Sequence, residues 1–490
     1  MKRISFDFNN MLAENIGQIN GVSRSDLAAI SDRARRAQAH LNRVISDPRN
    51  RLMLGLEWTK LPFQKKESVR AIQKMADDIT RHYENVISLG IGGSYLGLKA
   101  AQDALCPPYY NDFDSAREAW PRIYFDGNNL DPDTLNALLK NLNPRKTFVV
   151  VISKSGETTE TKAAFTVVED WLKKGVVARY GRQVIAITDP ESGTLRKRVM
   201  LEQSKDRLSF RSLPVMKGVG GRFSELNIGI LHMALVGIDI GNVLKGAEAM
   251  ARSLSSGDVY NNPALMYAAI HTILYRKKGK SIAIMMPFSE TLKSTADWYV
   301  QLLAESLGKK YHRRIRIMPG GAEKWENDPG NTAFYGRTPI SARGTNDLHS
   351  IQQNNIEGEN NKAITFINAL RFSSDIRIPA SGDIVSGKRY SELISLACEA
   401  CEWALTKESR PNCTITLPKI DAFYWGGLIY FFEMATALEG ELADVNAFDQ
   451  PGVEGYKNYM YYKLGKAGLA AHIAEDIMKS PLKKNPRFIL

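Results

Sequence analysis

The chain has 490 residues, of which 44% are hydrophobic and 24% charged, and its formal net charge is +12. This length predicts two domains with extensions, and the composition is that of an ordinary globular protein. The 65 basic side chains are spread among 53 acids without a nucleic-acid-binding motif, which disfavours nucleic acid and leaves either simple solubility or attraction of a phosphorylated substrate.

The first half of the chain predicts helices followed by an α/β domain. Residues 1–79 contain SRSDLAAISDRARRAQAHLNRVISD, which begins with a Ser cap and carries apolar residues at helical spacing, so we expect a helical N-terminal extension. From residue 80 the apolar runs NVISL, KTFVVVI and QVIAI alternate with turns and helical patterns. This alternation predicts a doubly wound parallel sheet in residues 80–250.

The second half repeats the alternation. SIAIMMPF, AITFINAL and CTITLP read as strands around the helix SETLKSTADWYVQLLAESLGKK, which predicts a second α/β domain in residues 251–420. Residues 318–350 are rich in Pro, Gly and Asn, and we expect a long functional loop there. Residues 421–490 are predicted to be a C-terminal helical segment.

Neither the cysteines nor the apolar segments indicate export or membrane insertion. Four cysteines are too few for a disulfide framework, and the CxxC of Cys398 and Cys401 lies in a predicted helix without a second pair. The N-terminus lacks a signal-like apolar stretch, and the segment 423–438 carries Glu433 and is shorter than the roughly 20 residues of a membrane span. We expect core thiols, a buried helix, no membrane contact and a cytoplasmic protein.

Two turns after predicted strands carry clustered hydroxyls. SKSGETTET at 153–161 opens a helix, whose free N–H groups and positive dipole suit a phosphate, although a Ser/Thr helix cap would use the same residues. GIGGSYLG at 90–97 follows another strand and supplies Gly93 and Ser94. It does not spell GxGxxG, and no acidic residue closes a second strand to hold a ribose. Together the two turns predict a phosphate pocket.

With these turns, the chain resembles the glucose-6-phosphate isomerase family, which is built on sugar-isomerase domains. Four further segments carry the resemblance: GGRFS at 220–224, AESLGK at 304–309, GTNDLHS at 344–350 and FDQPGVEGYK at 448–457. The last matches the family signature at every constrained position. The order and spacing of all six segments fit from about residue 80 to about residue 460.

The resemblance implies reversible isomerisation of glucose 6-phosphate and fructose 6-phosphate, in glycolysis and gluconeogenesis, through ring opening and a cis-enediolate. It implies no metal or other cofactor, and a homodimer in which His349 completes the partner's site. The residues it assigns are Glu305 as the base, Arg222 as the active-site cation, His349 and Lys457 for ring opening, and Gly93, Ser94, Ser153, Lys154, Ser155, Thr158 and Gln450 for substrate binding. The segment 421–490 would then complete the active site.

The chemistry needs these residue types. One carboxylate on a fixed helix can take a proton from one carbon and return it to the next. A fixed guanidinium stabilises the enediolate oxygens. An imidazole that titrates near neutrality suits protonation of the ring oxygen, and a neighbouring ammonium can polarise the same region.

Three rival functions remain. A regulator could keep the sugar-phosphate pocket without the chemistry, which the intact Glu305, His349 and Lys457 disfavour. An aminotransferring enzyme on the same domain pair would need a further domain, for which the chain has no room. An isomerase of a related hexose phosphate, or side activity on mannose 6-phosphate, stays open. Two positions depart from the family pattern: Glu157, expected to point away from the phosphate, and Glu225, which needs a partner if buried.

Overall fold

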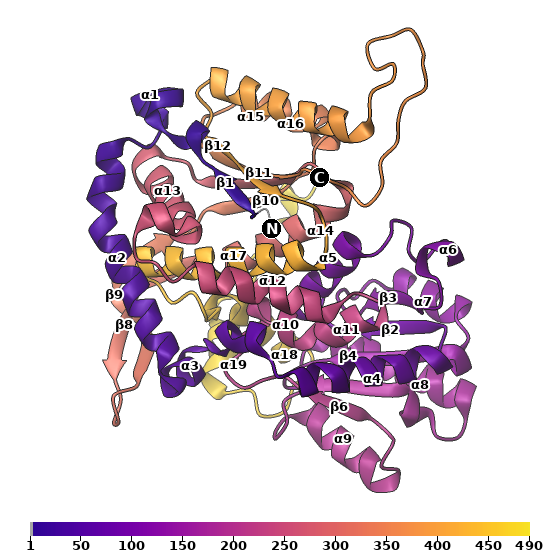
Figure 1. Ribbon diagram of the computed structural model, residues 1–490. Helices are drawn as coiled ribbons and strands as arrows, with labels where there is room; N and C mark the ends of the chain where they lie inside the picture. The colour runs from indigo at the N-terminus through magenta and orange to yellow at the C-terminus, as the bar shows by residue number, and fades with distance from the viewer. Residues whose placement is uncertain (1–2) are drawn as a thin grey trace. The chain divides into compact units, whose positions relative to one another are not determined.

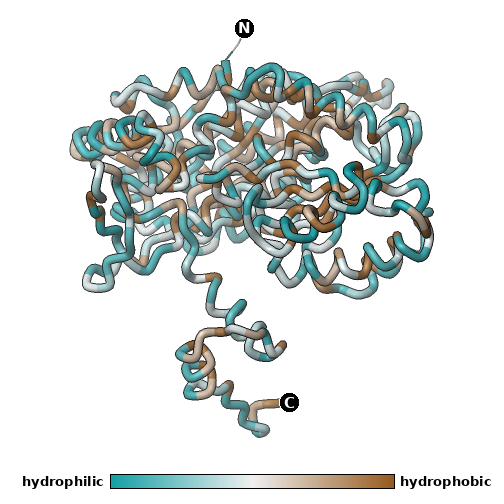
Figure 2. The backbone as a smooth tube through the Cα atoms, turned by 90° about the horizontal axis from the view of Figure 1, so that it is seen from below, coloured by the Kyte–Doolittle hydropathy of each residue, from teal (hydrophilic) through white to brown (hydrophobic). Residues whose placement is uncertain are grey.

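The computed structural model describes residues 3–490, in a large unit that ends at Phe448 and a small unit, Asp449–Leu490. In the described part of the chain, the large unit contains two five-stranded sheets, each with helices on both faces (Figure 1). Figure 2 shows that hydrophobic stretches of this unit lie mainly inside it, whereas its outer turns are hydrophilic.

The first sheet is wholly parallel. Its strands, in spatial order, are β3 (Arg122–Asp126), β2 (Asn85–Leu89), β4 (Thr147–Ile152), β5 (Val184–Thr188) and β6 (Arg211–Pro214). Strands β2 and β4 are buried along their full length. Alternate residues of β4 join two different apolar clusters, with Phe148 in one and Val149 in the other. Burial on both faces explains why the sequence shows unbroken apolar runs here.

Helices alternate with the strands of the first sheet along the chain. The helices of this half are α4 (Lys66–His82), α5 (Leu96–Leu105), α6 (Asp114–Arg117), α7 (Pro132–Asn141), α8 (Thr159–Val176), α9 (Thr194–Lys205), α10 (Glu225–Ile228) and α11 (Ile230–Leu235). The first α/β region thus has the predicted alternation.

The second sheet is parallel apart from one edge. Its strands, in spatial order, are β1 (Ser5–Asp7), β12 (Asn412–Leu417), β11 (Lys362–Ala369), β7 (Ile282–Pro287) and β10 (Thr338–Ser341). Strand β1 pairs antiparallel with β12, so the N-terminal extension is not wholly helical as predicted. Helices α1 (Ala13–Asn20), α2 (Arg24–Ser46) and α3 (Pro48–Leu54) follow β1. The predicted fold class, α/β with two parallel sheets and helical extensions, is confirmed.

The prediction of a long loop at 318–350 was wrong. Strands β8 (Lys309–Ile317) and β9 (Glu323–Tyr335) form an antiparallel ribbon that occupies much of this segment, and β10 follows it. Gly320 and Gly321, with φ of +87° and +84°, lie in the connection between the two strands. Gly320 and Gly321 thus supply the positive φ of a tight turn, whereas Pro329 and Gly330 lie within β9 and Pro339 lies within β10.

Helix α17 (Ala422–Ala443) contains the apolar segment and lies in the core. It is buried from Tyr424 onward and packs against α12 (Ile240–Ser253), α13 (Pro263–Lys278) and α14 (Lys293–Leu307). A Cβ atom at Gly246 would lie 1.7 Å from the carbonyl oxygen of Phe423, so this glycine permits the close crossing of α12 and α17. The buried-helix prediction is confirmed.

Helix α17 therefore finds its apolar partners within its own chain and does not need a second subunit to cover it. In residues 3–490, no helix is long and apolar enough to cross a membrane. Cys398 and Cys401 lie in α16 (Tyr390–Lys407) and are buried in its apolar cluster, as expected of core thiols. Burial raises the pKa of the Cys401 thiol to about 12, which keeps it protonated at neutral pH.

The remaining elements are short. Helix α15 (Gln352–Ile356) precedes β11, and the small unit contains α18 (Glu454–Lys463) and α19 (Ala471–Lys479). The domain boundaries at residues 79, 250 and 420 stay predictions.

Candidate active site

The two hydroxyl-bearing turns lie at neighbouring strand ends. Strands β2 and β4 are hydrogen-bonded partners, so the turn 90–97 and the turn 153–158 leave the same edge of the sheet. From β2 the chain moves to β3 on one side, whereas from β4 it moves to β5 on the other. This change of direction is the topological switch point at which open α/β sheets bind ligands.

The turn 153–158, where the phosphate is expected and which we call the phosphate turn, is ordered by its own hydroxyls. Ser153 Oγ accepts a hydrogen bond from the Gly156 backbone N–H at 3.0 Å, and Ser155 Oγ accepts one from the Glu157 N–H at 3.1 Å. Thr158 occupies the N-cap position of α8, yet its hydroxyl makes no capping hydrogen bond. The start of this helix therefore lacks the side-chain cap that was the alternative explanation, which suits an anion at the same place.

Two residues of the phosphate turn, Lys154 and Glu157, carry charged side chains. The Glu157 carboxylate lies 3.6 Å from Nζ of Lys162, in the first turn of α8, and its orientation away from the phosphate stays a prediction. Lys154 is exposed, and its backbone carbonyl accepts hydrogen bonds from the Asp189 N–H and the Thr188 hydroxyl, each at 3.2 Å. Backbone contacts thus secure the turn, while the Lys154 ammonium faces solvent.

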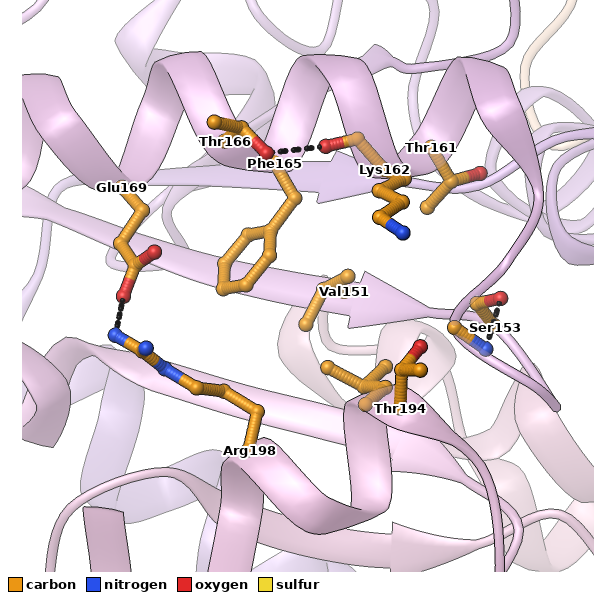
Figure 3. Close-up of a pocket in the computed structure, with 11 residues that line it drawn as sticks. Val151, Ser153, Thr161, Lys162, Phe165, Thr166, Glu169, Thr194 and Arg198 are labelled. Carbon is orange, nitrogen blue, oxygen red and sulfur yellow. Dashed lines mark hydrogen bonds and ion pairs between the residues drawn. The ribbon is translucent and has the colours of Figure 1, made fainter. Parts of the chain in front are cut away.

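A groove of about 260 Å³ opens beside the phosphate turn, between α8 and α9 (Figure 3). Val151 and Phe165 form apolar lining, and Ser153 lies at one end. At the other end, the Arg198 guanidinium donates to the Glu169 carboxylate at 2.6 Å. Lys162 also lines the groove and lies 3.6 Å from Glu157, so both basic side chains of the lining have a carboxylate partner.

The turn 90–97, which we call the glycine turn, packs directly on the segment that carries Arg222. A Cβ atom at Gly93 would lie 1.7 Å from the Gly221 carbonyl oxygen, so only glycine permits this contact. At Gly92 an added Cβ would lie 2.9 Å from Gln301 Nε2. The half-buried Ser94 belongs to the same turn. The turn after β2, the GGRFS segment and α14 therefore converge.

Arg222 is buried, with 2% of its surface exposed, and its guanidinium is held from several sides. Nε donates to Ser306 Oγ at 2.7 Å, and Nη2 donates to the Ala447 carbonyl oxygen at 2.7 Å. Nη1 lies 3.4 Å from Glu305 Oε2, which forms an ion pair. Neutral groups thus fix the orientation of the cation, and its charge is shared with the predicted base.

Glu305 lies in the last turn of α14, and its side chain is 31% exposed. Gln301, one turn earlier, donates from Nε2 to Glu305 Oε1 at 3.3 Å, while Lys309 Nζ donates to the backbone carbonyl at 2.6 Å. The carboxylate is therefore positioned by two long contacts, with Gln301 at 3.3 Å and with Arg222 at 3.4 Å. Its partial exposure leaves lone pairs for a substrate.

His349 ends a short 3-10 helix, Asn346–His349, that follows β10. The residue is exposed, and within residues 3–490 its imidazole makes no hydrogen bond or ion pair. Asp347 does not pair with it. Its carboxylate accepts from the Arg343 N–H at 2.7 Å and from the Ser350 hydroxyl at 3.0 Å, and it orders the loop from which His349 projects.

Gln450 and Lys457 belong to the small unit, so their place beside Glu305 stays a prediction. Gln450 precedes a 3-10 helix at Pro451–Val453, and Lys457 lies in the first turn of α18. Lys457 Nζ lies 3.0 Å from Glu454 Oε1. Burial opposes the charge of this ammonium, but the Glu454 carboxylate outweighs it and raises the lysine pKa, so the group is a cation at neutral pH.

Comparisons with known proteins agree with the geometry. A family model described as phosphoglucose isomerase matches residues 59–480. A glucose-6-phosphate isomerase from Carboxydothermus hydrogenoformans is 38% identical over 437 residues, which cover 88% of this chain and 89% of the relative. The chain belongs to the phosphoglucose isomerase family. A probable glucose-6-phosphate isomerase from the more distant Methanococcus maripaludis is 32% identical and covers 92% of each chain.

Solved structures extend the phosphoglucose isomerase likeness to the fold. A hypothetical protein from Thermus thermophilus superposes with a TM-score of 0.76 at 28% identity, covering 95% of this chain and all of that one (100%). A glucose-6-phosphate isomerase from Chlamydia trachomatis superposes with a TM-score of 0.75 at 20% identity, covering 94% of this chain and 90% of that one. The family resemblance inferred from the six segments is confirmed, and the roles of the individual residues stay predictions.

Three contacts of this phosphoglucose isomerase site were not predicted. Gln301 lies four residues before Glu305, and this spacing on a helix could have indicated their contact. Ser306 and the Ala447 carbonyl, which hold Arg222, left no signal in the sequence, because they lie 84 and 225 residues away from it.

Proposed function

We propose that this chain interconverts glucose 6-phosphate and fructose 6-phosphate, with Glu305 as the proton-transferring base and Arg222 as the cation that stabilises the enediolate. Family membership supports the reaction. The observation that carries the residue assignment is the 3.4 Å contact between the Arg222 guanidinium and the Glu305 carboxylate. It lies where the glycine turn meets α14, close to the edge at which the phosphate is expected.

The substrate phosphate binds at the two turns after β2 and β4. Ser94, Ser153, Ser155 and Thr158 offer hydroxyls, and α8 offers its N-terminal N–H groups. Gly93 and Lys154 contribute to the same turns. Remote binding of the phosphate positions the reacting carbons without taking part in the chemistry, which lowers the entropic cost of reaching the transition state.

The isomerisation step is a proton transfer between adjacent carbons. The Glu305 carboxylate takes the proton from C2 of the open-chain aldose, which yields the cis-enediolate, and returns it to C1. The proton of the C2 hydroxyl passes to O1, so that C2 becomes the ketone and C1 the alcohol. Arg222 stabilises the developing negative charge on the oxygens. Because the guanidinium is buried and fixed by Ser306 and Ala447, it needs no reorganisation as that charge forms.

Ring opening precedes this step, and we assign it to His349 and Lys457, with Gln450 beside the substrate. His349 is exposed on its own chain and makes no hydrogen bond within residues 3–490, which suits a side chain that reaches a partner's site. The protein is proposed to act as a homodimer in the cytoplasm, in glycolysis and gluconeogenesis, without metal or other cofactor and without nucleic acid or membrane partners.

One assay tests the reaction and its rivals. The purified chain receives fructose 6-phosphate, and a glucose-6-phosphate dehydrogenase reports the product. Turnover that the Glu305→Gln variant lacks supports the proposal. A regulator with the same pocket would bind fructose 6-phosphate, measured by calorimetry, and produce no glucose 6-phosphate, which would refute the enzymatic assignment.

A further inference from the structure

Glu225 is a buried carboxyl three residues beyond Arg222. It begins α10 directly after the GGRFS segment and has 0% of its surface exposed. A Cβ atom at Gly97 would lie 2.1 Å from Glu225 Cγ, so the side chain packs beneath the first turn of α5, next to the turn that carries Ser94. Burying an ionisable group here is costly unless it is paired or neutral.

The partners of this carboxyl come from two other helices. Trp298 on α14 donates from Nε1 to Glu225 Oε1 at 2.7 Å. Oε2 has no N–H or O–H partner within residues 3–490, and the Glu225 side chain contacts the carboxyl of Glu433 on α17. Glu433 is itself 3% exposed. Two carboxylates cannot hydrogen-bond to each other, so contact between them requires a proton on one.

Within residues 3–490, no basic side chain forms an ion pair with either carboxyl in place of that proton. On α17 the titratable neighbour is Tyr430, whose pKa is raised by burial and then by the charge of Glu433. Helix α14 contributes Trp298, and α5 contributes the backbone at Gly97. Burial raises the pKa of the Glu225 carboxyl to about 7. Burial and then the charge of Glu225 raise the pKa of the Glu433 carboxyl well above its usual value.

We propose that Glu225 and Glu433 share a proton and act as positioning residues, which hold the Arg222 segment against the helix that carries Glu305. The proposal rests on the roles assigned to Arg222 and Glu305. The Trp298–Glu225 hydrogen bond ties the GGRFS segment to α14. The bonds of Arg222 to Ser306 and Glu305 tie the same two segments together, two turns further along α14.

Ionisation would loosen this arrangement. As pH rises and the pair loses protons, negative charge builds up in a buried space without a counter-ion, and its repulsion and desolvation weaken the contact between α10 and α17. The folded-state pKa of Glu225 is raised, so its contribution to stability is complete below the unfolded-state pKa and is lost as pH rises through about 7. Turnover is also expected to fall as pH rises, because Arg222 moves with α10.

Infrared spectroscopy tests the shared proton without activity. The protein is labelled with ¹³C at glutamate side chains, and the C=O stretching band of protonated carboxyls is compared between wild type and Glu225→Gln at neutral pH. The amide of Glu225→Gln can still accept from Trp298 and donate to Glu433, but it cannot ionise. We expect the wild-type band to weaken in this variant. An unchanged band would mean that Glu225 carries no part of the proton, and the proposal of a shared proton would fail.

The pH dependence of kcat tests the positioning role. For Glu225→Gln, the ratio of kcat at about pH 8.5 to kcat at about pH 6.5 is expected to exceed the wild-type ratio at least about threefold, because the ionising pair has gone. Glu402→Gln is the matched control. Glu402 is a partly buried glutamate on α16 whose pKa is also raised by burial, but it contacts Thr414 instead of the site. Its variant should keep the wild-type ratio.

Two outcomes separate this proposal from the proposed function. If the infrared band weakens but the kcat ratio does not change, the proton is shared and the positioning role is refuted. If the wild-type chain has no isomerase activity, the proposed function fails, while the band still reports on the carboxyl pair. Should Glu225→Gln not fold, Glu433→Gln provides the same two measurements from the other side of the contact.

Discussion

Two arginine–glutamate pairs of the large unit, Arg337–Glu439 and Arg222–Glu305, are held in opposite ways. Arg337 and Glu439 are 0% and 1% exposed, and the guanidinium donates twice, at 2.5 and 3.2 Å. The Tyr335 hydroxyl donates to the same carboxylate at 2.9 Å. Between Arg222 and Glu305 the contact is 3.4 Å, and the glutamate is 31% exposed.

This difference separates a structural pair from one that can react. The Glu439 carboxylate is surrounded by donors, so it has little capacity left for a proton or a substrate. In the Arg222–Glu305 pair, Ser306 and the Ala447 carbonyl, both neutral, hold the arginine through hydrogen bonds of 2.7 Å, and the partly exposed glutamate keeps open lone pairs. Breaking the first pair should therefore cost stability, whereas changing the second should cost activity.

The largest effect is expected at Glu305. Glu305→Gln keeps the shape of the side chain and removes its basicity, so kcat should fall by about 10²–10⁴-fold or more, while affinity for a substrate analogue stays similar. Steady-state kinetics and calorimetry measure the two quantities. Because the ion pair is long and partly exposed, the unfolding midpoint in urea should barely move. Near-normal turnover would remove Glu305 from the role of base.

The Arg337–Glu439 pair should show the opposite response, a loss of stability without a loss of kcat. Glu439→Gln leaves Arg337 buried without its counter-ion, and the free energy of unfolding should fall by about 3–5 kcal/mol. The remaining folded protein should keep its kcat. Tyr335→Phe is the matched control, because it removes one hydrogen bond to the same carboxylate and should cost about 1.5–3 kcal/mol. Unchanged stability with a large loss of kcat in Glu439→Gln would overturn the comparison.

The phosphate turn should show a smaller effect on binding alone. Ser153→Ala combined with Thr158→Ala should weaken both a phosphorylated analogue and inhibition by free phosphate, by about 1.5–3 kcal/mol for each hydrogen bond lost. Thr166→Ala, further along α8, serves as control, since its hydroxyl donates to the Lys162 carbonyl. Normal binding by the double variant would place the phosphate elsewhere.

Subunit mixing tests whether His349 acts on a partner chain. Glu305→Gln and His349→Ala chains are each inactive, and in a mixed dimer one site carries both lesions and the other neither. Activity should rise toward half the native value per mixed dimer under exchange conditions. If His349 acts within its own chain, every site keeps one lesion and mixing restores nothing. Sedimentation as a monomer would already contradict the idea.

The smallest effect is expected from metal removal. Exhaustive dialysis against a chelator should leave kcat unchanged, because each proposed step uses a carboxylate, a guanidinium, an imidazole or an ammonium. Activity that is lost on dialysis and restored by zinc or another divalent ion would contradict the metal-free mechanism.

Local patterns predicted much of the fold. The unbroken apolar runs of β2 and β4 predicted strands buried on both faces, and hydroxyl-bearing turns followed them as expected. The ribbon of β8 and β9 was missed, because its Gly–Gly turn resembles a loop and its pairing joins residues that no local pattern connects.

By itself the sequence determined the family, the parallel sheets and the residue types of the site, because these depend on periodicity and on short segments whose chemistry is local. Only the tertiary structure decided how Arg222 is held and that Glu225 meets Glu433. In the first contact, Arg222 reaches the Ala447 carbonyl, 225 positions along the chain. The second joins two carboxyls, which would be expected to repel each other if only their residue types were known. Such contacts depend on how helices pack, so residues distant in the chain share a buried space that no short segment describes.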